Sequence, residues 1–211
     1  MDITWYGHSC FRLTERGKAA VVTDPYNGDI GYKLPRKLRA DIVTISHEAS
    51  GHNNRDWPHS TYVISGPGEY EIGGVFVIAV AMHHPDEPAR QNIVYVLDFD
   101  GLNVLHLGDL SYVPTQSEVE TLGAVNVALV PVGGGNALNA SQAAEVISLI
   151  EPDIIIPMHY KTPHTPLELE PLDKFLKVMG LGNVQPQEML RVSAAEIPEQ
   201  PQVVVLEPQQ S

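Results

Sequence analysis

Histidine is frequent in this sequence, and several of the histidines occupy positions suited to metal binding. Nine occur among 211 residues, and several of them, together with one aspartate, follow short apolar segments at four places in the chain. Loops at strand ends often carry ligands and catalytic groups, because the sheet holds them firmly and leaves them accessible. Imidazole and carboxylate ligands suit zinc, iron or manganese, and an ion with an open position lowers the pKa of a bound water toward about 7, which serves hydrolysis. The residues at these strand ends are His47, His52, His83, His84, Asp109 and His159.

Other catalytic chemistries find little support in the sequence. The G-x-S-x-G motif of serine hydrolases is absent, and Cys10 lies in a strand-like stretch with no base singled out for it. The glycine clusters are not followed by the Lys-Ser/Thr of a phosphate-binding loop. Among the remaining histidines, we interpret His106 as packed within a strand and His59 and His164 as surface residues.

Short apolar segments rich in β-branched residues dominate the chain, and Gly, Pro, Asp or Asn bounds each of them. Their length and boundaries predict strands. So many strands imply more than one sheet. The predicted strands are 3–6, 11–13, 20–23, 42–46, 62–65, 75–80, 93–98, 103–107, 127–130, 154–158 and 203–206.

Helical periodicity is confined to three segments. The clearest begins after Asn139, a good N-cap residue, with Gln142 three positions later to complete a capping box. Helices alternate with strands in the second half of the chain, which predicts a parallel crossover, whereas the first half predicts antiparallel strands. The predicted helices are 117–122, 140–150 and 171–179.

Composition and charge exclude several classes of function. Asp and Glu number 26 against 13 Lys and Arg, for a net charge of −13. Binding to nucleic acids or anionic membranes relies on clustered basic residues, so we expect neither partner. A single cysteine forms no internal disulfide, and the first residues lack the features of a signal peptide. We therefore expect a cytoplasmic protein with one domain over residues 1–207 and a frayed tail over 208–211.

Five segments of the sequence carry a family resemblance. They are ITWYGHS at 3–9, VTDP at 22–25, ISH at 45–47, HLGD at 106–109 and IPMHY at 156–160. In order and spacing they resemble the metallo-β-lactamase fold, and more narrowly the small metal-dependent hydrolases related to L-ascorbate-6-phosphate lactonase. The resemblance spans nearly the whole chain. It implies an α/β fold, a four-layer αββα sandwich of two mixed sheets, with metals held at one edge of the sheets.

The first metal motif of that family departs from its usual pattern in this chain. The family reads H-x-H-x-D-H, whereas residues 47–52 read HEASGH, so that Ala49 replaces a histidine and Gly51 replaces the aspartate. The resemblance implies two metal sites that share one aspartate, and each loses one protein ligand. The implied ligands are His47, His52, His84, Asp109 and His159.

Two neighbouring histidines compete for one of these ligand positions. We prefer His84 over His83, because His84 ends its segment where the family has its ligand, although a shift by one residue exchanges the two side chains. Asp24 resembles the carboxylate that orients the motif loop in the family. His8 lies in a segment that the family places near the site.

The resemblance implies a metal-dependent hydrolase that uses a metal-bound water on a small ester, lactone or phosphoester, with Asp109 and His52 as the catalytic residues. One or two zinc ions are expected, or manganese or iron, unless Ala49 and Gly51 abolish binding. The partner is then a small-molecule substrate, and a homo-oligomer is compatible with the fold. One alternative is a catalytically degenerate member that serves as a ligand-binding or interaction module. Another is a purely structural oligomer subunit.

Overall fold

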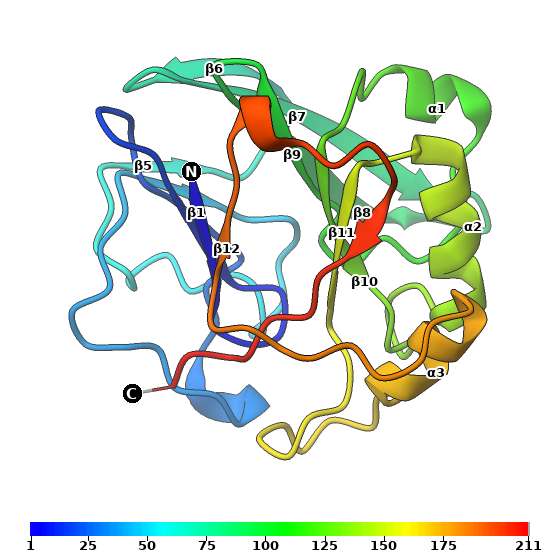
Figure 1. Cartoon of the computed structure of the whole chain (residues 1–211). Coiled ribbons are helices and arrows are strands. Elements are labelled where there is room, and N and C mark those ends of the chain that lie inside the picture. The colour runs from blue at the N-terminus through cyan, green and yellow to red at the C-terminus, as the bar shows by residue number, and fades with distance from the viewer. Residues whose placement is uncertain (211) are drawn as a thin grey trace.

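Two β-sheets face each other in the computed structural model, which describes residues 1–210 (Figure 1). The first sheet has the strand order β12-β1-β2-β3-β4-β5. Its strands β1 to β3 are antiparallel, and β3 to β5 are parallel, so the sheet is mixed. Its strands are β1 (Asp2–Trp5), β2 (Phe11–Thr14), β3 (Val21–Thr23), β4 (Ile42–Thr44), β5 (Tyr62–Ile64) and β12 (Leu190–Arg191).

The second sheet is also mixed and has the order β13-β11-β10-β9-β8-β7-β6. Strands β6 to β9 form an antiparallel meander, and β9, β10, β11 and β13 are parallel. The two mixed sheets confirm the predicted fold class. The strands are β6 (Gly68–Ile72), β7 (Val75–His84), β8 (Glu87–Phe99), β9 (Leu102–His106), β10 (Val127–Pro131), β11 (Ile154–Met158) and β13 (Gln202–Val203).

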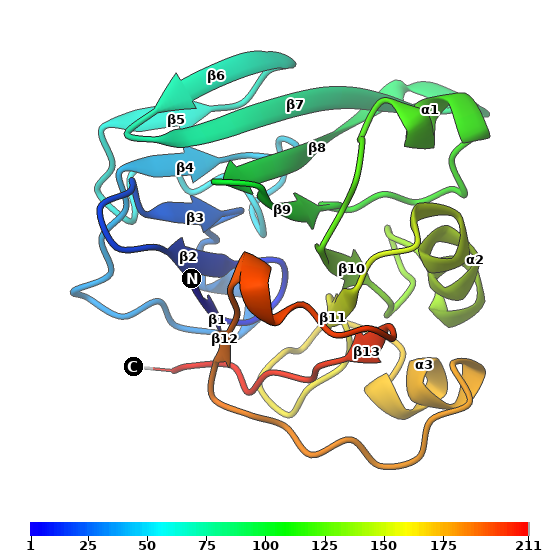
Figure 2. The same ribbon diagram turned by 45° about the horizontal axis from the view of Figure 1, so that its top comes forward.

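Helices cover the outer face of the second sheet (Figure 2). They are α1 (Gln116–Glu120), α2 (Ala140–Ile150) and α3 (Leu172–Val178). Helix α2 begins and ends at the predicted residues, and Asn139 and Gln142 form the predicted capping box. Ala143, Val146 and Ile147 are buried on one side of this helix, as the apolar periodicity indicates.

The outer face of the first sheet is covered differently from the expected helical layer. An irregular segment, residues 24–41, crosses it and includes only a short 3-10 helix, η1 (Gly28–Ile30). Tyr26, Ile30 and Tyr32 from this segment join a hydrophobic cluster with Val22 and Val43 of the sheet. A second apolar layer therefore forms without an α-helix.

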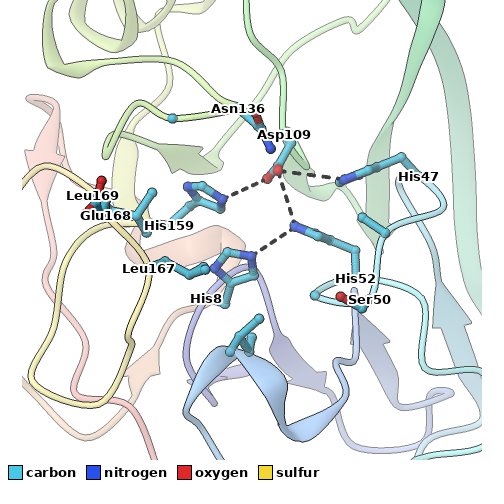
Figure 3. Close-up of a pocket in the computed structure, with 14 residues that line it drawn as sticks. His8, His47, Ser50, His52, Asp109, Asn136, His159, Leu167, Glu168 and Leu169 are labelled. Carbon is cyan, nitrogen blue, oxygen red and sulfur yellow. Dashed lines mark hydrogen bonds and ion pairs between the residues drawn. The ribbon is translucent and has the colours of Figure 1, made fainter.

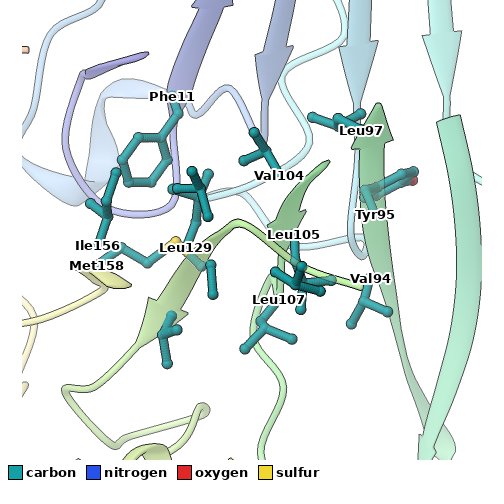
Figure 4. Packing of buried hydrophobic residues seen from close by; sticks show 14 of the residues in the cluster. Phe11, Val94, Tyr95, Leu97, Val104, Leu105, Leu107, Leu129, Ile156 and Met158 are labelled. Carbon is teal, nitrogen blue, oxygen red and sulfur yellow. The ribbon is translucent and has the colours of Figure 1, made fainter. Parts of the chain in front are cut away.

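The main core lies between the sheets and under the helices. It unites Phe11 of β2 with residues of β8, β9, β10 and β11, all of them nearly inaccessible to solvent (Figure 4). Leu129 and Ile156 lie on neighbouring parallel strands that are buried along their whole length. Such continuous apolar strands are typical of a sheet covered on both faces. The core fixes the strand ends from which the loops described below emerge.

The structure differs from the predicted strands mainly in the β7–β8 hairpin. Strand β7 runs four residues past Val80, the predicted end, and β8 begins six residues before Ile93, the predicted start. Strands β6 and β12 were not predicted, because the first is rich in Gly and Glu and the second has two residues.

The C-terminal segment returns to the first sheet. The N–H of Gln209 donates to the carbonyl of Trp5 at 2.8 Å, and the N–H of Lys33 donates to Oε1 of Gln210 at 3.0 Å. The predicted frayed tail is thus hydrogen-bonded as far as residue 210, and Ser211 lies outside the described residues. Within residues 1–210, no helix has the length and apolar character needed to cross a membrane.

Candidate metal centre

Four histidines and one aspartate converge in a cavity of about 290 Å³ (Figure 3). Each follows the carboxyl end of a strand, namely β1, β4, β9 or β11. The Asp109 carboxylate lies at the centre of the group. Its Oδ2 is 3.3 Å from Nε2 of His52 and 3.7 Å from Nε2 of His47, and its Oδ1 is 3.4 Å from Nε2 of His159. Nε2 of His8 is 3.0 Å from Nε2 of His52.

Asp24 fixes the orientation of His52. Its Oδ1 accepts the N–H of Ser46 at 2.7 Å, and its Oδ2 accepts the Ser46 hydroxyl at 2.5 Å and lies 2.8 Å from Nδ1 of His52. Burial would raise the pKa of Asp24, but the hydrogen bond from His52 and the nearby His106 outweigh it and lower that pKa. An ionised Asp24 places a proton on Nδ1 of His52 and leaves Nε2 to face the cavity.

The charges in the cavity are strongly coupled. Burial would raise the pKa of Asp109, but His159 and His52 hold it well below its usual range. Burial disfavours a charged His52, yet the carboxylates of Asp109 and Asp24 raise its pKa to about 10. Burial lowers the pKa of His47. Burial and the neighbouring histidines together lower the pKa of His8 well below its usual value. The cavity therefore places a cationic His52, together with His8 and His47 whose charged forms are disfavoured, around the Asp109 carboxylate.

His8 belongs to this cluster although the sequence did not single it out as a ligand. It is 4% exposed, and its ring centroid is 4.2 Å from that of His159. Its backbone has a φ of 53°, in the left-handed region that residues other than glycine rarely adopt. Its carbonyl accepts hydrogen bonds from Nε1 of Trp5 at 3.0 Å and from the N–H of His159 at 3.2 Å. The signals in the sequence are its place just after the first predicted strand and its membership of a segment that the family places near the site.

His84 does not line this cavity. It lies in β7, where its Nδ1 accepts the N–H of Asp86 at 3.2 Å and its ring meets Tyr112 edge-on at 5.6 Å. His83 pairs with Gln91 in the same hairpin and is also absent from the cavity lining. The preference for His84 assumed that the strand ends at Val80, whereas β7 continues and carries both histidines farther along the hairpin.

The residues present fit a bound metal ion. Oδ1 of Asp109 and Nδ1 of His159 are buried and lack a hydrogen-bond partner within the described chain, so the groups around the cavity are not satisfied by one another. The ligand atoms of His8, His52 and His159 all lie within 4.8 Å of one another. Three imidazoles and a carboxylate form a donor set suited to zinc or a related ion.

Comparison with known proteins identifies similar chains. Residues 2–159 match the family described as the beta-lactamase superfamily domain. A UPF0173 protein of Pyrococcus furiosus is 30% identical over 77% of this chain and 84% of its own. A UPF0173 metal-dependent hydrolase of Pyrococcus horikoshii is 32% identical over 72% of this chain and 68% of its own. A solved Thermotoga maritima protein of the metallo-beta-lactamase superfamily, whose name marks it as a candidate Zn-dependent hydrolase, is 38% identical over 97% of both chains, with a TM-score of 0.80.

Proposed function

Because the chain belongs to the beta-lactamase superfamily domain family, we propose that it is a metal-dependent hydrolase of small molecules. The observation that carries this proposal is the convergence of imidazole Nε2 atoms on the Asp109 carboxylate inside a cavity. Burial of polar groups without hydrogen-bond partners costs free energy. A module that only bound another protein would gain nothing from burying these groups. The names of relatives from Pyrococcus horikoshii and Thermococcus onnurineus support the same activity.

Four of the ligands implied by the sequence resemblance belong to the proposed site, namely His47, His52, Asp109 and His159. His84 is left out of it, because it does not line the cavity. When bound, a zinc, manganese or iron ion would supply Lewis acidity and lower the pKa of a water molecule near the substrate. Asp24 orients His52 through the contact of its Oδ2 with Nδ1 of His52. The hydroxyl oxygen of Ser46 lies 2.9 Å from Nδ1 of His47 and orients that histidine.

The cavity favours a small substrate without much negative charge. Its volume of about 290 Å³ is just below the usual range for small-molecule sites, about 300–1,000 Å³. Ile30, Leu167 and Leu169 supply apolar walls, while Asp109 and Glu168 supply negative charge. Among residues 1–210, those lining the cavity include no Lys or Arg to receive a phosphate group. We therefore favour a neutral lactone or ester over a phosphoester.

The test is metal analysis followed by a substrate screen. Protein purified without chelator is analysed for zinc, manganese and iron, and is then assayed against neutral lactones, carboxylic esters and phosphoesters. We expect bound metal, turnover that a chelator abolishes and metal restores, and a preference for the uncharged substrates. The Asp109→Asn variant should lose this turnover, whereas the surface variant His164→Ala should keep it. Absence of any metal-dependent turnover across the panel contradicts the proposal.

A further inference from the structure

The His8 imidazole lies against Gly51, the position where the metal motif of the family has an aspartate. We propose that the His8 imidazole takes the place of the carboxylate that is absent at Gly51, so that the chain holds a single ion on His8, His52, Asp109 and His159. This inference rests on the proposed function, because it assumes that the cavity binds a metal. It adds a ligand and fixes the number of ions.

The space around Gly51 is filled by His8. A Cβ atom added at residue 51 would lie 3.1 Å from Nε2 and 3.4 Å from Cδ2 of His8, and 3.4 Å from Cγ2 of Ile30. Gly51 is not among the glycines with positive φ, so its backbone conformation does not demand glycine. The absence of a side chain is therefore explained by the approach of the imidazole, which stands where an aspartate side chain would begin.

Neighbouring donor atoms lie at separations close to those around one ion. Ligand atoms about 2.0–2.1 Å from a tetrahedral zinc lie about 3.3 Å from each other. The observed separations are 3.0 Å between Nε2 of His8 and Nε2 of His52, 3.3 Å between Nε2 of His52 and Oδ2 of Asp109, and 3.4 Å between Oδ1 of Asp109 and Nε2 of His159. The ligand atoms of the three histidines all lie within 4.8 Å of one another. Zinc also accepts a fifth ligand during catalysis, so four protein donors leave access for water or substrate from the cavity.

The backbone around His8 is anchored as a ligand-bearing loop requires. In addition to the two hydrogen bonds to its own carbonyl, the next carbonyl, that of Ser9, accepts Nε2–H of His106 at 2.9 Å and the Thr23 hydroxyl at 3.0 Å. His159 has the same positive φ of 53° as His8. Such backbone conformations are strained and persist where the surroundings fix them, commonly at functional sites.

A second ion lacks sufficient ligands in the described chain. On the far side of Asp109 only His47 remains, since Ala49 offers no ligand atom and His84 is outside the cavity lining. Asp24 lies near His47 and His52, but its two oxygens already receive the Ser46 N–H, the Ser46 hydroxyl and His52. A single His and a shared carboxylate are too few for a second tightly held ion.

The experiment exchanges the two candidate ligands. His8→Asn removes the imidazole, and asparagine tolerates the left-handed backbone at this position. Gly51→Asp is made alone and in combination with His8→Asn, and His164→Ala serves as the matched surface control. Zinc per chain is measured by elemental analysis after desalting, and the dissociation constant is measured by competition with a chromophoric chelator. Circular dichroism and the melting temperature confirm that each variant is folded.

We expect one zinc per chain in the wild type and in His164→Ala. His8→Asn should weaken zinc binding by about 100-fold or more, because loss of a ligand exceeds the 10- to 100-fold effect of losing an outer partner. Gly51→Asp should weaken binding in the wild-type chain, where it displaces His8. In the His8→Asn chain the same substitution should strengthen binding, to within about 10-fold of wild type.

Three results overturn the inference alone. Two tightly bound ions in the wild type refute the single site. Wild-type affinity in folded His8→Asn refutes the ligand role, as does a Gly51→Asp effect of the same sign in both backgrounds. In each of these cases metal-dependent turnover by the wild type still supports the proposed hydrolase. A wild-type chain that binds none of zinc, manganese or iron refutes the hydrolase and this inference together.

Discussion

The buried Asp24 offers a sharp test of how the metal centre is organised. Asparagine at this position has nearly the same shape but no charge. Its amide oxygen would accept the Ser46 N–H, which now lies 2.7 Å from Oδ1 of Asp24. The amide nitrogen would then face Nδ1 of His52, at the position where Oδ2 now lies 2.8 Å away. Because that nitrogen donates, His52 must move its own proton to Nε2, where it blocks metal binding.

The size of the effect follows from the hydrogen bond that is lost. A hydrogen bond to a charged group contributes about 1.5–3 kcal/mol. A change of about 1.4 kcal/mol corresponds to tenfold in affinity, so Asp24→Asn should weaken zinc binding by about 10- to 100-fold. This agrees with the usual effect of removing a carboxylate that supports a histidine ligand.

The assay is a zinc titration of the folded variant in competition with a chromophoric chelator. Asp41→Asn is the matched control, because Asp41 also accepts a backbone N–H, that of Ala20 at 2.8 Å, but is exposed and does not line the cavity. The control should bind zinc as the wild type does. Affinity of folded Asp24→Asn within about threefold of wild type, well under the expected tenfold, would refute the account of how His52 is oriented.

Four further outcomes are expected. The metal-free chain holds His52 protonated, with a pKa of about 10, so zinc must displace one proton when it binds. The affinity for zinc should therefore rise about tenfold per pH unit from pH 7 to 9. A zinc affinity that does not change with pH would contradict this. Protons compete with the metal for the imidazole ligands as the pH falls, so elemental analysis of protein desalted at about pH 5 should find the metal lost, and an unchanged metal content would contradict this. His84→Ala should retain the wild-type zinc content, and a loss would return this residue to the ligand set. Asn139→Ala removes the N-cap of α2 and should lower the free energy of unfolding by about 1 kcal/mol, measured by urea titration. An unchanged urea midpoint would show that the cap contributes nothing to stability.

Much of the fold could be predicted because its signals are local. The apolar, β-branched segments identify most of the strands, and Asn139 with Gln142 defines the start of α2. The covering of the first sheet could not be predicted in the same way. Tyr26 and Tyr32 bury their rings from a segment without regular secondary structure, so no periodicity marks them.

The candidate site was predictable only as far as its residues follow strand ends. His47, His52, Asp109 and His159 follow predicted strands, and the structure brings all four together. His8 lies far from His159 in the sequence, and only the folded structure places their ring centroids 4.2 Å apart.

The most direct test of the metal centre is anomalous X-ray scattering from crystals of the zinc-loaded protein. The account predicts one strong peak per chain, surrounded by Nε2 of His8, His52 and His159 and by the Asp109 carboxylate. A pair of peaks bridged by Asp109, or no peak in this cavity, would contradict it.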